Sequence, residues 1–239
     1  MKRIAIIEDE QTIRENYIDL MSRVGYQIDG YRNREEAMQA FSVRLPDLAI
    51  IDVGLGQEYD GGFLLCQQLR QLSATLPIIF LTARDNDFDT ISGLRLGADD
   101  YLSKEIGLEH LMVRISTLFR RVALQYAPLK DQQTVIKRGE LTIDNNKMQV
   151  AWKQQLIEIT ITEFWIIHAL AHRAGVVRSR QQLMSDANMV VDENTITSHI
   201  KRIRKKFLHI DPSFNEITAI YGMGYRWDIN AQPTSGSLQ

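Results

Sequence analysis

The first half of the chain alternates short apolar runs with stretches of helical periodicity, and this alternation constrains the fold more than any other feature. The apolar runs are residues 3–7, 48–53, 77–81 and 100–102. Apolar residues spaced three or four apart predict helices between and after them, over residues 12–24, 34–42, 62–71, 87–96 and 108–121. Continuous apolar strands that alternate with helices form a parallel sheet covered on both faces. With about five strands, the sequence predicts a doubly wound α/β domain.

Charge divides the chain into two parts. Residues 1–121 hold 14 Lys/Arg and 19 Asp/Glu, whereas residues 122–239 hold 14 Lys/Arg and 11 Asp/Glu. An acidic half joined to a basic half indicates two tasks, one of which involves nucleic acid. The boundary contains a proline and no apolar period, which is typical of a linker. We predict a first domain at 1–121, a linker at 122–136, a second domain at 137–230 and a disordered tail at 231–239.

Composition excludes several classes of protein. The single cysteine, Cys66, rules out a disulfide framework and a cysteine-based zinc site. It also fits a reducing, cytoplasmic location. Apolar runs stay well short of the roughly 18 residues of a membrane span, so we expect no membrane partner.

The predicted strand ends carry an unusual set of polar residues. In chain order these are Glu8, Asp9 and Glu10, then Asp52, then Thr82, and finally Lys104. Because the carboxyl ends of parallel strands meet at one edge of a sheet, these groups should converge there. Each residue alone has a simpler explanation, such as a turn, a helix cap or a solvated side chain. Their joint occurrence at successive strand ends argues against coincidence.

Such an edge is suited to phosphoryl chemistry. Clustered carboxylates repel one another unless a cation joins them, and Mg²⁺ prefers an open site of carboxylates and water. A carboxylate beside Mg²⁺ can attack phosphorus and form an aspartyl phosphate. The metal and Lys104 would neutralise the phosphoryl oxygens, and the Thr82 hydroxyl would hydrogen-bond one of them.

The first half resembles the receiver domain of two-component response regulators, which has a flavodoxin-like fold. The matching segments are IIEDE (6–10), LAIID (48–52), LTARD (81–85), GLRLGADDYLSK (93–104) and LFRR (118–121). The resemblance implies that Asp52 is the phosphoacceptor, that Lys104 pairs with the phosphate, and that Thr82 and Tyr101 form a switch pair. The Mg²⁺ ligands that it implies are Asp9, Asp52, the backbone carbonyl of Gly54 and, through water, Glu8.

Two segments depart from the family pattern. Lys104 precedes Glu105 instead of the usual proline, whose peptide bond is often cis. A cis bond before a non-proline residue costs about 3–4 kcal/mol, so either the strain is kept or this loop differs. The loop after Asp52 reads VGLGQEYDGG, which lacks the usual proline and is one residue longer. This loop and LTARDNDFD (81–89) are similar to the regulator of proteobacterial dedicated sortase systems.

The second half contains a basic amphipathic helix over residues 193–208. Ile196, Ile200, Ile203 and Phe207 form its apolar face. The other faces carry Thr195, Thr197, Ser198, His199, Lys201, Arg202, Arg204, Lys205 and Lys206. A solvated basic helix is the usual explanation of such a pattern. Short polar side chains followed by cations are also what a recognition helix needs in the major groove.

Gly222 and Gly224 then predict a hairpin after this helix. The segments RGELTID (138–144), TITEFWIIHAL (160–170), RSRQQLM (178–184), NTITSHIKRIRKK (194–206) and YGMGYRW (221–227) resemble the winged helix-turn-helix domain of OmpR/PhoB-type regulators. The resemblance implies contacts with double-stranded promoter DNA by Thr197, Ser198, His199, Arg202 and Arg204. Tyr221 replaces an arginine of the wing, and the loop before Thr195 is short, which puts minor-groove readout and the contact with RNA polymerase in question.

We therefore predict a transcription regulator, not an enzyme, that a sensor histidine kinase phosphorylates on Asp52. Phosphorylation would favour a homodimer that places two recognition helices on spaced half-sites. The family's dimer ion pairs fall here on Asp99, Asp100, Arg114 and Arg121.

Two other classes of function remain open from the sequence. The first is a constitutive DNA-binding regulator with a structural receiver, which phosphorylation would leave unchanged in DNA affinity. The second is a Mg²⁺-dependent phosphohydrolase that uses Asp52, for which the sequence shows no substrate-pocket motif.

Overall fold

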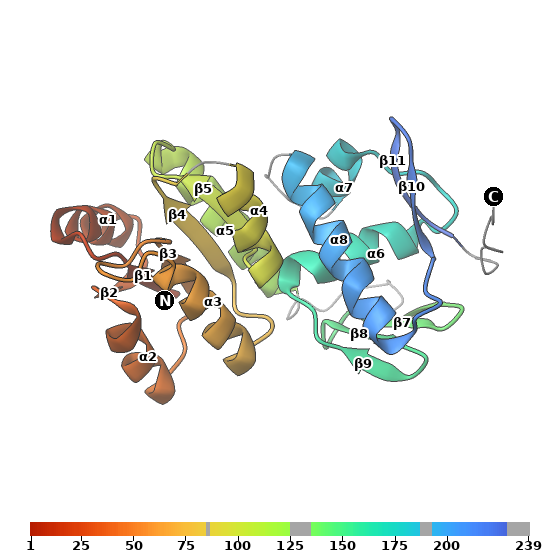
Figure 1. The fold of residues 1–239 in the computed structure, drawn as a ribbon, viewed down its shortest axis with the longest axis horizontal. Helices are drawn as coiled ribbons and strands as arrows, with labels where there is room; N and C mark the ends of the chain where they lie inside the picture. Colours follow the sequence, from red (N-terminus) through yellow and green to blue (C-terminus); the bar gives the residue numbers. More distant parts are fainter. Residues whose placement is uncertain (85–86, 125–134, 187–192, 229–239) are drawn as a thin grey trace. The chain divides into compact units, whose positions relative to one another are not determined.

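The computed structural model describes residues 1–84, 87–124, 135–186 and 193–228, which divide into two units (Figure 1). The units are Met1–Met112 and Val113–Gln239, and helix α5 (Leu108–Leu124) spans their boundary. The predicted linker overlaps the end of α5 and the start of the next strand at Val135. Its middle, residues 125–134, lies outside the described residues, as does the tail predicted at 231–239.

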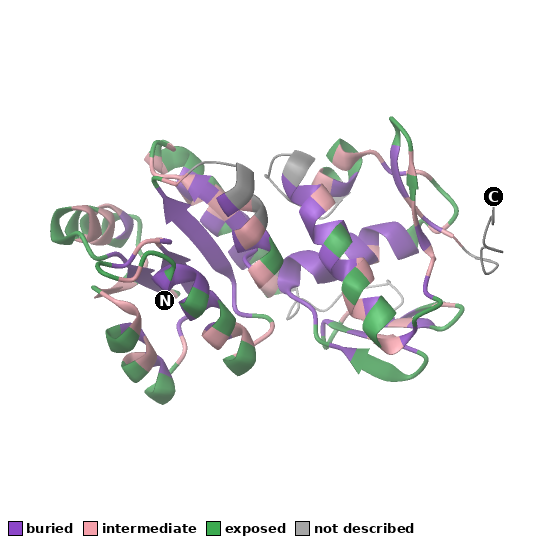
Figure 2. Ribbon diagram, in the orientation of Figure 1, coloured by how far each residue is buried: buried purple, intermediate pink, exposed green. Residues whose placement is uncertain are grey.

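Five parallel strands form the sheet of the first unit, in the order β2-β1-β3-β4-β5. The strands are β1 (Arg3–Ile7), β2 (Gln27–Tyr31), β3 (Leu48–Ile51), β4 (Ile78–Thr82) and β5 (Asp100–Ser103). The central strands β1, β3 and β4 are almost wholly buried, as their continuous apolar runs predict (Figure 2). The doubly wound parallel sheet is therefore confirmed.

Helices cover both faces of this sheet. Besides α5 they are α1 (Gln11–Arg23), α2 (Arg34–Val43), α3 (Gly61–Leu72) and α4 (Asp87–Leu96). Helices α2, α3 and α4 are neighbours, and Ile7, Ile51 and Tyr31 pack into the core beneath α2 and α3. Helix α1 covers the opposite face, because Gly30, next to Tyr31, lies against Ile18 of α1.

After α5, the described part of the second unit continues with a four-stranded antiparallel sheet in the order β6-β7-β8-β9. The strands are β6 (Val135–Arg138), β7 (Leu141–Asp144), β8 (Gln149–Trp152) and β9 (Gln155–Ile157). Three helices follow, α6 (Ile161–His172), α7 (Arg180–Asp186) and α8 (Glu193–Ile210). The antiparallel hairpin of β10 (Ile217–Ile220) and β11 (Gly224–Trp227) is the last element of the described residues and confirms the predicted hairpin, which we call the wing.

One apolar core joins these helices to the sheet and the hairpin. Trp152 of β8 packs its ring against Phe207, Phe214 and Trp227 at centroid distances of 5.2–6.3 Å. Thr160 caps α6 through a capping box, in which its hydroxyl and the Glu163 carboxylate each accept a backbone N–H bond. No helix in the described part of the chain is long and apolar enough to cross a membrane.

Candidate functional site

Three carboxylates meet at the carboxyl edge of the parallel sheet. Glu8 and Asp9 follow β1, and Asp52 follows β3, so the two strands deliver them to the same place. The Asp52 amide donates to the Ile7 carbonyl at 2.9 Å, which continues the strand pairing to the acidic residues themselves. One carboxylate oxygen from each acid lies within 4.8 Å of the others. Glu8 is buried, Asp52 is half-buried and Asp9 is exposed, so the cluster is open on one side.

Lys104 supplies the positive charge of this edge. It follows β5, and its Nζ lies 2.6 Å from Asp52 Oδ2 and 2.6 Å from Glu8 Oε2. Burial acts to lower the pKa of Lys104, but its hydrogen bonds to both carboxylates outweigh burial and raise that pKa. Burial raises the pKa of Glu8, because the bond to Lys104 only partly offsets the loss of solvent. A further cation at the open side would therefore find oxygen ligands that still lack full charge compensation.

The carboxylates fit a divalent cation that prefers oxygen. Magnesium is held in proteins by a few carboxylates while it keeps several waters, and the open side beside Asp9 leaves room for them. Gly54 lies two residues after Asp52, in the loop that borders the cluster, and its carbonyl stays a predicted ligand. The residues present are thus compatible with Mg²⁺.

An arginine that the sequence reasoning missed holds the backbone of the acidic pair. Arg14, in the first turn of α1, donates from Nη1 to the Glu8 carbonyl at 2.6 Å and to the Asp9 carbonyl at 3.2 Å. These bonds orient the segment that presents both carboxylates. The only signal in the sequence is the position of a cation one helical turn beyond the acids, which is too common to predict a role.

The two predicted switch residues both bond to Arg84. Thr82, at the end of β4, is buried, and its hydroxyl accepts from the Arg84 amide at 3.3 Å. The Tyr101 hydroxyl donates to the Arg84 carbonyl at 2.6 Å, and the Tyr101 ring lies 5.7 Å from that of Phe80. Peptide bonds of the described residues are all trans, including that between Lys104 and Glu105, so this loop differs from the usual cis form.

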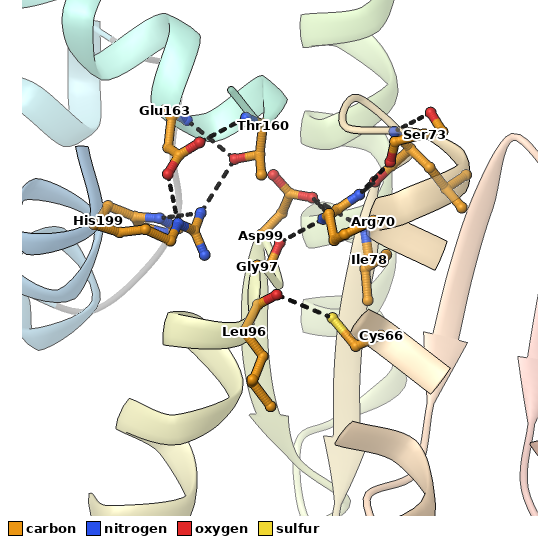
Figure 3. A network of polar contacts seen from close by, with 12 residues as sticks. Cys66, Arg70, Ser73, Ile78, Leu96, Gly97, Asp99, Thr160, Glu163 and His199 are labelled. Carbon is orange, nitrogen blue, oxygen red and sulfur yellow. Dashed lines mark hydrogen bonds and ion pairs between the residues drawn. The ribbon is translucent and has the colours of Figure 1, made fainter. Parts of the chain in front are cut away.

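Two of the four predicted dimer residues, Asp99 and Asp100, have partners inside the first unit. The Asp99 carboxylate is fully buried and accepts from Arg70 Nη2 at 2.9 Å and from the Ile78 amide at 3.0 Å (Figure 3). Asp100 is buried as well and accepts from the Tyr101 amide. Asp99 therefore forms its ion pair within the same chain, with Arg70, whereas the resemblance implied an ion pair between two chains. The side chain of Arg121 lies outside the described residues.

The predicted recognition helix α8 buries its apolar face as expected. Ile196, Ile200, Ile203 and Phe207 are all buried in the core of the second unit. The polar and basic residues of this helix that we consider for DNA contact divide by exposure. Lys201 and Lys205 are exposed, Thr197 and Arg204 are half-buried, and Thr195, Ser198, His199 and Arg202 are buried.

Two of those buried residues belong to an ionic network beneath α8 (Figure 3). Arg202 Nε lies 2.5 Å from Glu163 Oε1, and Lys206 Nζ lies 2.6 Å from Glu163 Oε2. Arg202 also approaches Thr160 Oγ1 and His199 Nδ1, both at 3.2 Å. Burial acts to raise the pKa of Glu163, but Arg202 and Lys206 lower it to about 2. His199 and Arg202 thus face α6, which differs from the DNA contact expected of them.

A second cluster, also missed from the sequence, joins α7, α8 and the wing. Arg180 Nε lies 3.4 Å from Thr197 Oγ1, and the Tyr225 hydroxyl lies 3.3 Å from the same oxygen. The Arg180 and Arg204 guanidinium groups lie 5.9 and 6.0 Å from the centre of the Tyr225 ring. Arg204 also donates twice to the Ile217 carbonyl of β10. At the tip of the wing, Tyr221 is fully exposed.

Comparison with known proteins gives two family matches. The model described as "Response regulator receiver domain" matches residues 4–116. The model described as "Transcriptional regulatory protein, C terminal" matches residues 153–227. These matches coincide with the parallel sheet that carries the acidic cluster and with the helices and hairpin of the second unit.

Relatives match over nearly the whole chain. The transcriptional regulatory protein BaeR of Escherichia coli O6:H1 is 33% identical, over 96% of this chain and 94% of its own length. The transcriptional regulatory protein CreB of Escherichia coli is 34% identical, over 92% of this chain and 95% of its own length. The phosphate regulon transcriptional regulatory protein PhoB of Rhizobium meliloti is 31% identical, over 94% of this chain and 98% of its own length. A solved structure of a RitR mutant has the same fold, with a TM-score of 0.73, 21% identity, and coverage of 96% of this chain and 100% of that one.

Proposed function

The chain belongs to the OmpR/PhoB-type response regulators of two-component systems, and from this premise we propose which residues carry out its phosphorylation and its DNA binding. It is a phosphorylatable DNA-binding transcription regulator. We propose Asp52 as the phosphoacceptor. The observation that carries this proposal is the position of Lys104, whose amine lies 2.6 Å from both Asp52 and Glu8.

The phosphoryl donor would be a histidine of a sensor kinase. An Asp52 oxygen attacks phosphorus as the bond from phosphorus to the imidazole nitrogen breaks, so the electron pair leaves with the donor. Lys104 then pairs with a phosphoryl oxygen, and the Thr82 hydroxyl donates to another. When bound by Glu8, Asp9, Asp52 and the Gly54 carbonyl, Mg²⁺ would neutralise the remaining negative charge. The product stays on the chain, so the site serves as a switch instead of turning over a substrate.

The second unit would bind promoter DNA through the exposed side of α8. We assign phosphate or base contacts to Lys201, Lys205, Thr197 and Arg204, and we add Arg180 from the cluster beside the wing. We assign His199 and Arg202 to the support of α8 from within. A protein that binds chromosomal promoters works in the cytoplasm.

Phosphorylation would act through dimerisation of the receiver. Asp100, Arg114 and Arg121 stay candidates for the ion pairs of that dimer, whereas Asp99 is already neutralised by Arg70. Two receivers joined this way would raise the effective concentration of one recognition helix for the second half-site. Contact with RNA polymerase would follow at the promoter.

Phosphorylation with a small-molecule donor tests the acceptor. The full chain is incubated with phosphoramidate and Mg²⁺, and the incorporated phosphoryl groups are counted by intact-mass spectrometry. We expect one group on the wild-type chain, none on Asp52→Ala, and wild-type labelling on the control Asp19→Ala, which removes an exposed acid of α1. Undiminished labelling of Asp52→Ala would show that the acceptor lies elsewhere.

A further inference from the structure

The loop after Asp52 (residues 53–60) forms a short hairpin, and an arginine of α2 binds it on one side. Leu55 and Glu58 form an antiparallel bridge with two backbone bonds of 3.1 Å, around Gly56 at a φ of +63°. Arg34 of α2 holds the Glu58 carboxylate with two bonds of 2.8 Å. These contacts hold residues 55–58 in a defined hairpin.

A second arginine, Arg84, fastens the other side of the same loop. Its Nη1 donates to the Tyr59 carbonyl at 2.9 Å and to Asp60 Oδ1 at 3.0 Å. Its guanidinium lies 4.1 Å from the centre of the Tyr59 ring. Nε and Nη2 form a fork on the buried Asp89 of α4, at 2.8 and 2.6 Å. One side chain thus joins the Asp52 loop to the first turn of α4.

The backbone of Arg84 bonds to both predicted switch residues. Its amide donates to Thr82 Oγ1 at 3.3 Å, and its carbonyl accepts from the Tyr101 hydroxyl at 2.6 Å. The fork on Asp89 and the bonds to residues 59 and 60 leave this backbone little freedom to move independently of the loop. The position of the Tyr101 acceptor is therefore tied to the loop that begins at the phosphoacceptor.

We propose that Arg84 is a positioning residue that couples the Asp52 loop to Tyr101. A change at Asp52 would then reach Tyr101 along two routes, through Thr82 and through the loop held by Arg84. The proposal rests on the proposed function only in taking Asp52 as the site of modification. The coupling itself exists in the unmodified chain, so it can be measured without phosphoryl group or metal.

Hydrogen exchange of the Leu55 and Glu58 amides measures the coupling. Both amides are protected by the bridge, so their exchange rates report local opening of the loop. The rates are measured by NMR on the full chain for wild type, Tyr101→Phe, Arg84→Ala and the double variant. Arg84→Lys, which keeps the charge and loses the fork, replaces Arg84→Ala if thermal unfolding shows that the alanine variant does not fold.

We expect Tyr101→Phe to accelerate exchange of both amides roughly two- to tenfold, the effect of one lost hydrogen bond. Arg84→Ala should accelerate it by more, since it removes the link itself. The double variant should exchange no faster than Arg84→Ala alone, because without the Arg84 side chain the backbone that bonds to Tyr101 is no longer linked to residues 59 and 60.

Arg34→Ala is the matched control, because Arg34 holds the same loop through the Glu58 carboxylate instead of through Arg84. In a variant that carries both changes, the acceleration of amide exchange by Arg34→Ala should multiply with the acceleration by Tyr101→Phe, because the two residues act on the loop independently. The proposal is overturned if Tyr101→Phe leaves the exchange rates of both amides unchanged. It is also overturned if the accelerations caused by Tyr101→Phe and Arg84→Ala multiply in the double variant. Failure of Asp52 to accept phosphate would appear in the mass measurement and would leave these exchange rates as they are, so the two failures are distinguishable.

Discussion

Arg14 shows how a single residue sets the geometry of the acidic site without contributing a ligand to it. It bonds to the backbone carbonyl oxygens of Glu8 and Asp9, so these two bonds do not occupy their carboxylates. Its positive charge opposes a bound cation, whereas its hydrogen bonds favour one by fixing the ligands. These two effects have opposite signs, so a test of positioning must keep the charge.

Arg14→Lys makes that separation. Lysine keeps the charge but cannot reproduce the planar guanidinium that reaches both carbonyls. We expect the affinity for Mg²⁺, measured by calorimetry on the full chain, to fall about three- to tenfold, which is the effect of one to two net hydrogen bonds. Arg23→Lys, in the last turn of the same helix, should leave the affinity unchanged. Equal affinities for Arg14→Lys and wild type would contradict the positioning role.

At the scale of elements, the ionic network of Glu163 joins helix α6 to helix α8. His199, Arg202 and Lys206 each directly precede an apolar residue of α8, so they lie along one flank of its buried stripe. Arg202 and Lys206 both end on Glu163, whose backbone also completes the cap of α6. The network therefore fixes the rotation of the recognition helix about its axis, and with it the set of side chains that face outward.

Glu163→Gln tests this junction. The change leaves Arg202 buried without its counter-charge and should lower the free energy of unfolding by about 3–5 kcal/mol. Because the pKa of Glu163 is lowered to about 2, its ionisation stabilises the fold above the unfolded value of 4.5, and this contribution is lost as the pH falls from 4.5 to 2. That part of the acid sensitivity should disappear in the variant.

Urea unfolding followed by tryptophan fluorescence provides the measurement. All three tryptophans, Trp152, Trp165 and Trp227, lie in the second unit, so the signal reports that unit alone. Glu158→Gln, an exposed change of the same kind, is the control. A similar loss of stability in both variants would show that the pairs of Glu163 add nothing.

Sequence patterns identified the elements with strong apolar signals and missed those without them. Strands β1, β3, β4 and β5 were predicted because each is an apolar run. Strand β2 (QIDGY) was missed because it forms the edge of the sheet and buries no residue fully. Strand β6 was missed because it has only Ile136 in the core and follows a polar stretch. Helix periodicity located α8, but it does not reveal which flank of a helix meets its neighbour.

The same limit applies to the sites. The acidic residues could be located because each ends a strand, and the strand order brings the ends together. Arg14, Arg84 and Arg180 could not, because they act on backbone oxygens or on residues distant in the chain. The inward position of Arg202 depends on a single glutamate of another helix, and nothing in the spacing of α8 predicts that.

At the scale of the whole molecule, opposite net charges separate the two tasks. The acidic half concentrates carboxylates where a cation and a phosphoryl group would bind, and the basic half presents lysines on the open side of α8. The excess of acidic groups in the first half disfavours its binding to DNA, so the second half should account for the salt dependence of DNA binding.

Salt dependence measures how many cations of α8 neutralise phosphates. The binding affinity for duplex DNA of mixed sequence is measured over a range of salt concentrations. In the plot of log affinity against log salt concentration, the magnitude of the slope should fall by about 1 for Lys201→Ala and by about 1 for Lys205→Ala. Lys147→Ala, in the exposed turn between β7 and β8, changes the net charge equally and should lower the slope far less. If Lys147→Ala reduced the slope as much as the α8 variants, the overall charge of the second unit would drive binding, and the outward face of α8 would not be the interface.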